Sequence, residues 1–264
     1  MMQYGAMNFP VNPILDEIKM IAAMGFDYLE LTMDPPCAHY SVIREYKKDI
    51  LKALGACSLG LVCHLPSFVY TADFTESIRK ASLDEMLNSL EVAAELGVSK
   101  AVLHPSMVSG LGIYVMDTVR KYAFQSLEAI AEKAEKKGIC LCFENMFPNY
   151  GFFSEPEEFV EIFEKFPEFM LTLDIGHANI ESKKGGKRIL DFIEKLGTRI
   201  AHIHVSDNSG KKDEHLPVGK GTVPFPKIIR ALKKAGYQNT VTLEIFTEDR
   251  RHLLVSRDRF AAHV

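Results

Sequence analysis

Six acidic or histidine residues recur along the chain at intervals of about 30 to 40 residues, each at the end of a short apolar run that predicts a β-strand. The six are His64, His104, Glu144, Asp174, His204 and Glu244. This interval is the length of one strand–helix unit, and strands that alternate with helices form a parallel sheet. We therefore expect the six side chains to lie at the same end of one sheet.

The spacing of apolar segments predicts eight such units. The expected strands lie near residues 3–7, 28–32, 61–64, 100–104, 139–144, 170–174, 200–206 and 240–246. Amphipathic segments between them predict helices, for example over 83–96 and 122–137, where Gly97 and Gly138 mark the helix ends. Gly25, Gly197 and Gly236 fit three further helix ends, and 248–264 supplies the eighth helix.

The length of the chain agrees with one closed barrel. A chain of 264 residues is close to the length of about 250 that is typical of a single (β/α)8 barrel. No linker rich in proline or serine divides it. The predicted fold class is therefore α/β, with a single (β/α)8 TIM barrel over residues 1–264.

Strand alternation predicts which side chains face the barrel axis. Residues two apart in a strand share a face, so Cys140, Cys142 and Glu144 point one way. The same rule pairs Thr172 with Asp174 and Thr242 with Glu244, with large aliphatic residues on the opposite faces. A carboxylate at the last inward position lies at the mouth, where TIM barrels build their active sites. We expect the two cysteines, which lie deeper, to fill the barrel, and the alternative is that they bind a soft metal ion.

Glu, Asp and His side chains that converge on one face are typical ligands of divalent metal ions. A second histidine, His177, follows Asp174, and Gly176 is expected to bend the chain sharply between them. The long polar loop after the seventh strand adds Asp207, Asp213 and His215, and such loops are often functional. The predicted metal ligands are His64, His104, Glu144, Asp174, His177, His204, Asp213, His215 and Glu244. We expect one to three ions of Zn, Mn or Mg.

Each of these residues has an ordinary structural explanation when it is taken alone. A histidine at a strand end often hydrogen-bonds within a core, and a glutamate often pairs with lysine. The recurrence of ligand types on six strands favours a site. His202 lies one layer below His204 and is expected to support a ligand or to fill the core. Glu30 is expected either to contact substrate or to pair with a loop cation. No function is expected for His39, His252, His263 or the Lys211–Lys212 loop tip, although a phosphate contact at that tip is the alternative.

Composition limits the classes of protein. A net charge of −4 gives no basic surface of the kind that binds nucleic acid. The five cysteines form no CxxC pair, which indicates reduced thiols in a cytosol. No apolar stretch of about 18 residues and no secretory signal occur, so we expect a cytoplasmic protein without a membrane partner. No feature predicts an oligomeric state.

At its candidate ligands the chain resembles the xylose isomerase-like TIM-barrel superfamily, over nearly its whole length. This superfamily includes sugar and sugar-phosphate isomerases and epimerases, and the endonuclease IV-type abasic-site nucleases. The motifs that carry the resemblance are Cys63-His-Leu-Pro66, Leu103-His-Pro105, Phe143-Glu-Asn145, Leu173-Asp-Ile-Gly-His177, His204-Val-Ser-Asp-Asn208, Asp213-Glu-His-Leu-Pro-Val-Gly-Lys-Gly221 and Leu243-Glu-Ile245.

The isomerase and epimerase branch implies one divalent ion held by Glu144, Asp174, His204 and Glu244. In that branch the two glutamates, Glu144 and Glu244, also act as acid and base on opposite faces of a sugar carbon. The resemblance makes His177 a substrate-contacting residue, and we place His64 and Glu30 with it as substrate-binding candidates.

The nuclease branch implies three zinc ions on nine residues, and all nine predicted ligands have counterparts there. Other features differ from that branch. The first strand region reads Tyr4-Gly-Ala-Met-Asn-Phe-Pro10, and the loop after the second strand contains no arginine before Arg44. We therefore predict a divalent-metal-dependent isomerase or epimerase of a small sugar or sugar phosphate, acting by proton transfer beside a carbonyl with a metal-stabilised enediolate. The alternative is a zinc-dependent abasic-site phosphodiesterase, for which nucleic acid would be the partner.

Overall fold

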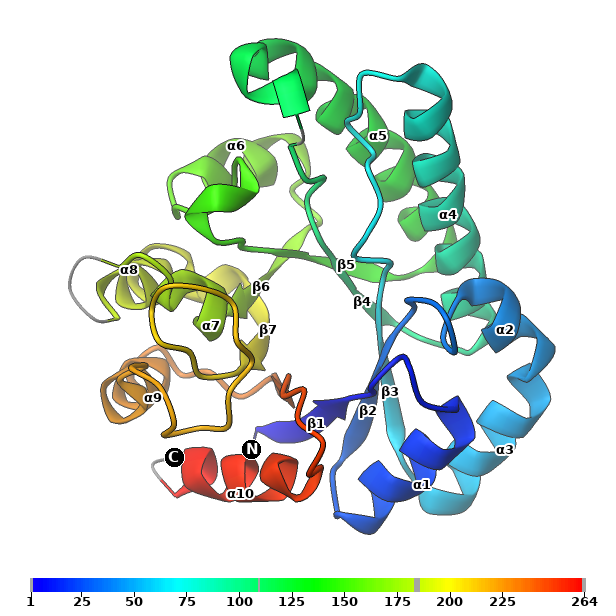
Figure 1. The fold of residues 1–264 in the computed structure, drawn as a ribbon, viewed down its shortest axis with the longest axis vertical. Helices are drawn as coiled ribbons and strands as arrows, with labels where there is room; N and C mark the ends of the chain where they lie inside the picture. The colour runs from blue at the N-terminus through cyan, green and yellow to red at the C-terminus, as the bar shows by residue number, and fades with distance from the viewer. Residues whose placement is uncertain (1, 109, 183–185, 263–264) are drawn as a thin grey trace.

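The structure is a computed structural model that describes residues 2–108, 110–182 and 186–262. Eight parallel strands follow one another around a closed barrel, and β1 pairs with β8 to complete it (Figure 1). The strands are β1 (Gln3–Met7), β2 (Tyr28–Thr32), β3 (Gly60–His64), β4 (Lys100–Leu103), β5 (Cys140–Glu144), β6 (Met170–Asp174), β7 (Ile200–Val205) and β8 (Thr240–Leu243). The predicted TIM barrel is confirmed.

Helices surround the strands (Figure 1). They are α1 (Ile14–Ala23), α2 (Tyr40–Glu45), α3 (Lys47–Cys57), α4 (Glu76–Glu95), α5 (Met116–Lys137), α6 (Glu158–Lys165), α7 (Ile175–Asn179), α8 (Lys187–Leu196), α9 (Phe225–Lys234) and α10 (Arg251–Ala261). In the described part of the chain, short 3₁₀ turns occur at η1 (Gly110–Tyr114), η2 (Pro148–Tyr150) and η3 (Gly197–Arg199). No helix within the described ranges is both long enough and apolar enough to cross a membrane.

The expected glycines follow the ends of helices, and all but one of them have the left-handed conformation typical of that position. Gly97 and Gly138 follow α4 and α5 with φ angles of 76° and 67°, a left-handed conformation that glycine adopts without strain. Gly197 also follows a helix, but its φ of −53° is right-handed, and the chain continues into η3. The last helix, α10, lies inside the 248–264 segment that was expected to be helical. His263 falls outside the described residues.

Alternation along the strands separates an outer apolar layer from a polar barrel interior. Leu171, Leu173 and Val241 are fully buried in the hydrophobic core. The Tyr28 hydroxyl lies 2.8 Å from Thr242 Oγ1, which places β2 and β8 side chains together inside the barrel. The predicted inward and outward faces are confirmed, and His104 and Glu244 each lie one residue beyond a strand end.

Candidate active site and metal centre

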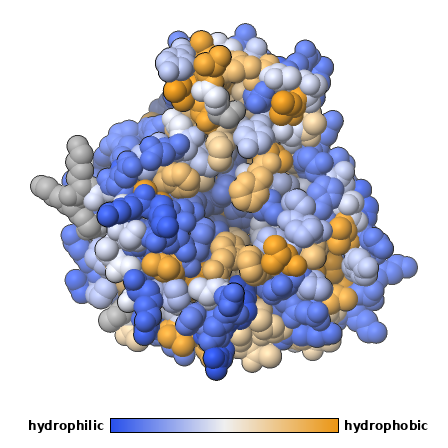
Figure 2. All heavy atoms as spheres, viewed as in Figure 1, coloured by the Kyte–Doolittle hydropathy of each residue, from blue (hydrophilic) through white to orange (hydrophobic). Residues whose placement is uncertain are grey.

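A cavity of about 390 Å³ opens at the mouth of the barrel. Figure 2 shows the hollow near the centre of this face, with hydrophobic residues beside it. Its lining residues come from the strand ends and the loops that follow them. They are Met7, Phe9, Pro10, Thr32, Asp34, His64, Ser67, Phe68, His104, Met107, Met146, Phe147, Tyr150, His177, Asp213, His215, Glu244 and Phe246.

Four predicted ligands meet at the base of this mouth. Glu144, Asp174, His204 and Glu244 each offer one ligand atom, and these atoms all lie within 4.8 Å of one another. His204 Nδ1 lies 3.3 Å from Glu144 Oε1, 3.6 Å from Asp174 Oδ2 and 3.2 Å from Glu244 Oε2. The parallel register explains this, because Asp174 pairs directly with His204 across β6 and β7.

The bonding of these carboxylates fits a divalent cation. Glu144 Oε2, Asp174 Oδ2 and Glu244 Oε2 are buried and have no hydrogen-bond partner. Imidazole nitrogens approach them to 3.1, 3.6 and 3.2 Å, but without hydrogen-bond geometry. A buried carboxylate oxygen without a partner is costly, and coordination to a cation would remove that cost. Carboxylate oxygens together with an imidazole nitrogen suit Zn, Mn or Mg.

Two further groups of predicted ligands adjoin the first. Glu144 Oε2 lies 3.4 Å from His64 Nε2 and 3.1 Å from His104 Nε2, so Glu144 belongs to two groups. Asp213 Oδ2 lies 3.4 Å from His177 Nε2 and 2.8 Å from His215 Nε2. All nine predicted ligands therefore share one mouth, while the binding of metal by them stays a prediction.

Imidazoles and carboxylates in this cluster shift one another's pKa values. Burial raises the pKa of Glu144, but the charges of His104 and His204 outweigh it and hold the pKa well below its usual range. For Glu244, burial also raises the pKa, and His215 and His204 lower it to about 2. Burial lowers the pKa of His204, whereas Glu30, Glu144 and Glu244 raise it well above its usual range. Both glutamates are thus ionised at neutral pH.

Asp174 behaves differently from its neighbours. Burial raises its pKa, and the charges of Glu244 and Glu144 raise it further, against the opposing charge of His177. Asp174 Oδ1 also accepts a hydrogen bond from the His177 backbone N–H at 2.6 Å, which caps α7. Three carboxylates this close repel one another, and a divalent cation would reduce that repulsion.

The short helix α7 changes the expected role of Gly176. Instead of a sharp bend, the chain enters one helical turn directly after Asp174. A Cβ atom on Gly176 would lie 2.4 Å from Ser206 Oγ, a distance that side chains do not tolerate. The glycine thus allows α7 to approach the β7 end closely, which brings His177 to the site.

The loop that carries Asp213 and His215 is held in place by Asp207. Its carboxylate accepts hydrogen bonds from the backbone N–H groups of Asn208, Gly219, Gly221 and Val223, at 2.8 to 3.1 Å. A Cβ atom on Gly221 would lie 2.2 Å from the Asn208 carbonyl oxygen. Asp207 thus shapes the loop, and its carboxylate faces backbone rather than the ligand groups.

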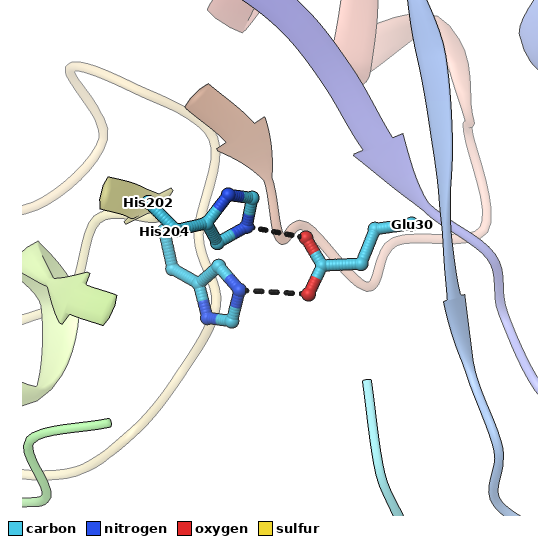
Figure 3. A group of neighbouring side chains, drawn as sticks. All are labelled: Glu30, His202 and His204. Atoms are coloured by element: carbon cyan, nitrogen blue, oxygen red, sulfur yellow. Dashed lines mark hydrogen bonds and ion pairs between the residues drawn. The ribbon is translucent and has the colours of Figure 1, made fainter. Parts of the chain in front are cut away.

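Glu30 lies deeper than expected, and Figure 3 shows its carboxylate facing the rings of His202 and His204. β2 continues two residues beyond it to Thr32, and Glu30 is fully buried beneath the mouth. Both of its oxygens are engaged, one by His202 Nε2 at 2.8 Å and the other by His204 Nε2 at 2.9 Å. Glu30 does not line the cavity, and its partners are histidines. This geometry differs from both expectations, a substrate contact and a loop cation.

The residues expected to be incidental lie away from this cluster. His39 contacts Glu85 at 2.9 Å on the outside of the barrel, and His252 lies 3.2 Å from Thr247 Oγ1. Lys212 is exposed, 3.9 Å from Glu214, as a solvated loop tip would be. Cys142 is buried and Cys140 partly buried inside the barrel, in agreement with the expected filling role.

Several pocket residues were not predicted. Asp34 accepts hydrogen bonds from the Thr32 hydroxyl at 2.8 Å and the Ser67 hydroxyl at 3.0 Å. Asp34 lies two residues past the end of β2, and this position could have indicated a pocket residue. Phe9 and Phe246 stack at the rim with ring centroids 5.5 Å apart. β8 ends at Leu243, so Phe246 lies in a loop beyond the strand that was expected to include it, and Phe9 lies in the loop after β1. Neither loop has a periodicity from which this contact could be predicted.

We expect Glu144→Ala and Asp174→Ala each to weaken metal binding by at least 100-fold. Loss of a residue that only hydrogen-bonds to a metal ligand costs about 10 to 100-fold in affinity, and loss of a direct ligand should cost more. The fold should persist, because neither side chain belongs to the apolar core. Calorimetric titration with Mn²⁺ or Zn²⁺ and circular dichroism measure both effects. Glu164→Ala, on the exposed face of α6, is the control. Unchanged affinity in both variants would remove these residues from the metal site.

We expect metal affinity to rise with pH through neutrality. A proton and a cation compete for His204 Nδ1, and burial, although it lowers the pKa of His204, is outweighed by the surrounding carboxylates. The His204 proton is therefore still present above pH 6.5, and its displacement gives about a tenfold gain in affinity per pH unit. Titrations with Mn²⁺ between pH 6 and 8 test this. An affinity that stops rising at pH 6.5 would contradict it.

Comparison with known proteins supports the resemblance seen in the motifs. A family model described as xylose isomerase-like TIM barrel matches residues 18–260. An uncharacterised protein of Methanocaldococcus jannaschii is 30% identical over 92% of this chain and 83% of its own. Fructoselysine 3-epimerase of Escherichia coli O157:H7 is 21% identical over 95% and 93%. The crystal structure of a D-tagatose 3-epimerase-like protein matches with a TM-score of 0.88 and 26% identity, over 99% and 97%. The chain belongs to the xylose isomerase-like TIM-barrel family.

Proposed function

We propose that this protein is a divalent-metal-dependent isomerase or epimerase of a small sugar, acting by proton transfer at the carbon beside a carbonyl. The observation that carries the proposal is the group of four ligand atoms from Glu144, Asp174, His204 and Glu244, within 4.8 Å of one another, with Glu244 facing the cavity. The family and the epimerases among the matched proteins support the same class of reaction.

The two glutamates supply the acid and the base in this proposal. They approach the same atom, His204 Nδ1, from different strands, Glu144 at the end of β5 and Glu244 just after β8. Both are ionised at neutral pH because the neighbouring histidines outweigh burial in setting their pKa values, and an ionised carboxylate can accept a proton from carbon. A divalent cation bound there would stabilise, as a Lewis acid, the negative charge that develops on the substrate oxygens.

Access differs between the two. Glu244 lines the cavity, whereas Glu144 is fully buried behind a ring of histidines. We assign Glu244 the proton transfer nearest the entering substrate and Glu144 the opposite side of the ligand group. Return of the proton to the neighbouring carbon of the enediolate gives isomerisation, and return to the opposite face of the same carbon inverts that carbon.

The other pocket residues provide recognition of a sugar. His177 and Asp34 face the cavity and offer polar atoms to hydroxyl groups. Phe9, Phe246 and Met7 form an apolar wall, which suits the C–H face of a sugar ring or chain. A mostly apolar pocket with a few polar groups that converge is the usual form of a small-molecule site.

The charge of the pocket favours a neutral sugar over a sugar phosphate. None of the described residues that line the cavity is lysine or arginine, and Asp34, Asp213 and Glu244 are acidic. Arg250 lies nearby but is engaged by Glu17 and by the backbone carbonyls of Met7 and Ile245. Phosphate binding normally uses arginine, lysine or free backbone N–H groups.

The nuclease alternative has one observation in its favour, the gathering of all nine predicted ligands at one mouth. The matched proteins with named activities reported above are epimerases, which does not favour it. Among the described residues that line the cavity there is also no lysine or arginine, the residues that most often hold nucleic-acid phosphates.

We expect incubation with substrate in deuterium oxide to place solvent deuterium at the carbon beside the carbonyl, because Glu244 exchanges its proton with solvent through the open cavity. The substrates to assay are free ketoses with Mn²⁺-loaded protein, followed by NMR. Glu244→Gln should reduce exchange by about 100-fold or more, in line with the usual contribution of a general base.

Direct return of the same proton could conceal exchange, so product formation is measured in parallel. Glu164→Ala should retain full activity. Absence of turnover of every ketose and ketose phosphate, together with metal-dependent cleavage of an abasic DNA duplex, would replace this proposal with the nuclease function.

We expect a free ketose to be converted at least tenfold more efficiently than its phosphate ester, measured as kcat/KM on matched pairs. A phosphate dianion facing Asp34, Asp213 and Glu244 with no lysine or arginine beside it would lose more than about 1.4 kcal/mol of binding free energy, which corresponds to that factor. A preference for the phosphate ester would overturn the assignment of a neutral substrate.

A further inference from the structure

Glu30 lies directly beneath the candidate metal site, and the ring of His204 lies between the two. The residue is on β2, His202 and His204 are on β7, and the three side chains meet across the barrel interior (Figure 3). All three are fully buried. Glu30 Oε1 lies 2.9 Å from His204 Nε2, and Glu30 Oε2 lies 2.8 Å from His202 Nε2.

The two nitrogens of His204 face different groups. Nδ1 points at the carboxylates of Glu144, Asp174 and Glu244, and Nε2 points at Glu30. An imidazole that gives the lone pair of Nδ1 to a cation carries its proton on Nε2. Glu30 is the acceptor that this N–H requires. Carboxylates placed behind metal-bound histidines fix the ring orientation and increase ligand basicity.

We propose that Glu30 is a positioning residue, which holds His204 in the orientation and tautomer that present Nδ1 to the metal site. This inference rests on the metal site of the proposed function. It assigns Glu30 no contact with substrate and explains why a carboxylate is buried below the mouth.

The second oxygen of Glu30 shows why the carboxylate stays in this orientation. His202 holds that oxygen, and His202 Nδ1 lies 2.7 Å from Thr240 Oγ1. The Thr240 hydroxyl accepts a further hydrogen bond from Lys100 Nζ at 2.8 Å. Glu30 is thus fixed from below by a chain of partners that reaches the lower end of the barrel. A carboxylate held at both oxygens can fix the ring above it.

Glu30→Gln tests the inference, because glutamine keeps the size of the side chain but replaces one acceptor with an N–H₂ donor. One histidine Nε2–H would then face a donor. We expect Co²⁺ affinity, measured by competition with a chelator, to fall by about 10 to 100-fold, and the visible absorption bands of bound Co²⁺ to shift. Thr172→Val is the control, since Thr172 is buried inside the barrel and its hydroxyl binds the Cys142 carbonyl oxygen. It should bind Co²⁺ within about threefold of the parent, well under the effect of an outer partner.

A measurement on the parent protein does not depend on the folding of any variant. In Zn²⁺-loaded protein, the Nε2–H of His204 should give a downfield ¹H–¹⁵N NMR signal, and Nδ1 should show the shift of a metal-bound nitrogen. The reverse assignment, with Nε2 bound to metal, would overturn the inference. Co²⁺ affinity and absorption bands that Glu30→Gln leaves unchanged would overturn it as well.

These measurements separate this inference from the proposed function. A loss of Co²⁺ affinity in Glu30→Gln, in a protein that converts no sugar, would support the role of Glu30 and refute the isomerase. Normal sugar turnover with no change in metal affinity would support the isomerase and refute the role of Glu30.

Discussion

The interaction on which the site depends is the contact between buried carboxylates and imidazoles inside a closed barrel. Glu30, Glu144 and Asp174 have no solvent exposure, and Glu244 has 8%. Burying a carboxylate is costly unless a partner compensates it. Here His202 and His204 compensate Glu30 completely, whereas each carboxylate above them keeps an oxygen without a hydrogen bond. The lower layer is therefore satisfied by protein alone, and the upper layer has the character of a cation site.

Much of this arrangement could be predicted from the sequence because a parallel barrel follows two simple periodicities. The interval between strand ends placed Glu144, Asp174 and His204 at one mouth, and the two-residue alternation placed them inward. Depth along the axis was harder to predict. Glu30 has the same inward orientation, but β2 continues two residues beyond it to Thr32, so Glu30 reaches His204 from below. Its partners depend on the stagger between β2 and β7, which lie on different parts of the barrel.

The contacts that hold the loops were not predicted from the sequence. Asp207 binds four backbone N–H groups, which a polar loop with two glycines made plausible but did not specify. Gly176 was recognised as important for the wrong reason, since close approach to Ser206 requires it. The stacking of Phe9 on Phe246 joins loops after β1 and β8, neighbours only once the barrel has closed. Contacts of this kind arise from closure and have no local pattern.

Carboxylates at the two depths of the barrel interior differ in how firmly hydrogen bonds hold them. A residue tied at both oxygens, such as Glu30, cannot accept a proton from substrate without breaking a buried hydrogen bond, which costs about 1 to 3 kcal/mol. Glu244 has an oxygen without a hydrogen bond and faces the cavity, so proton transfer there breaks no such bond. The same residue type thus has two proposed roles, proton transfer for Glu244 at the mouth and positioning of His204 for Glu30 beneath it. In the proposed reaction, an oxygen without a hydrogen bond, more than residue type, distinguishes Glu144 and Glu244 from Glu30.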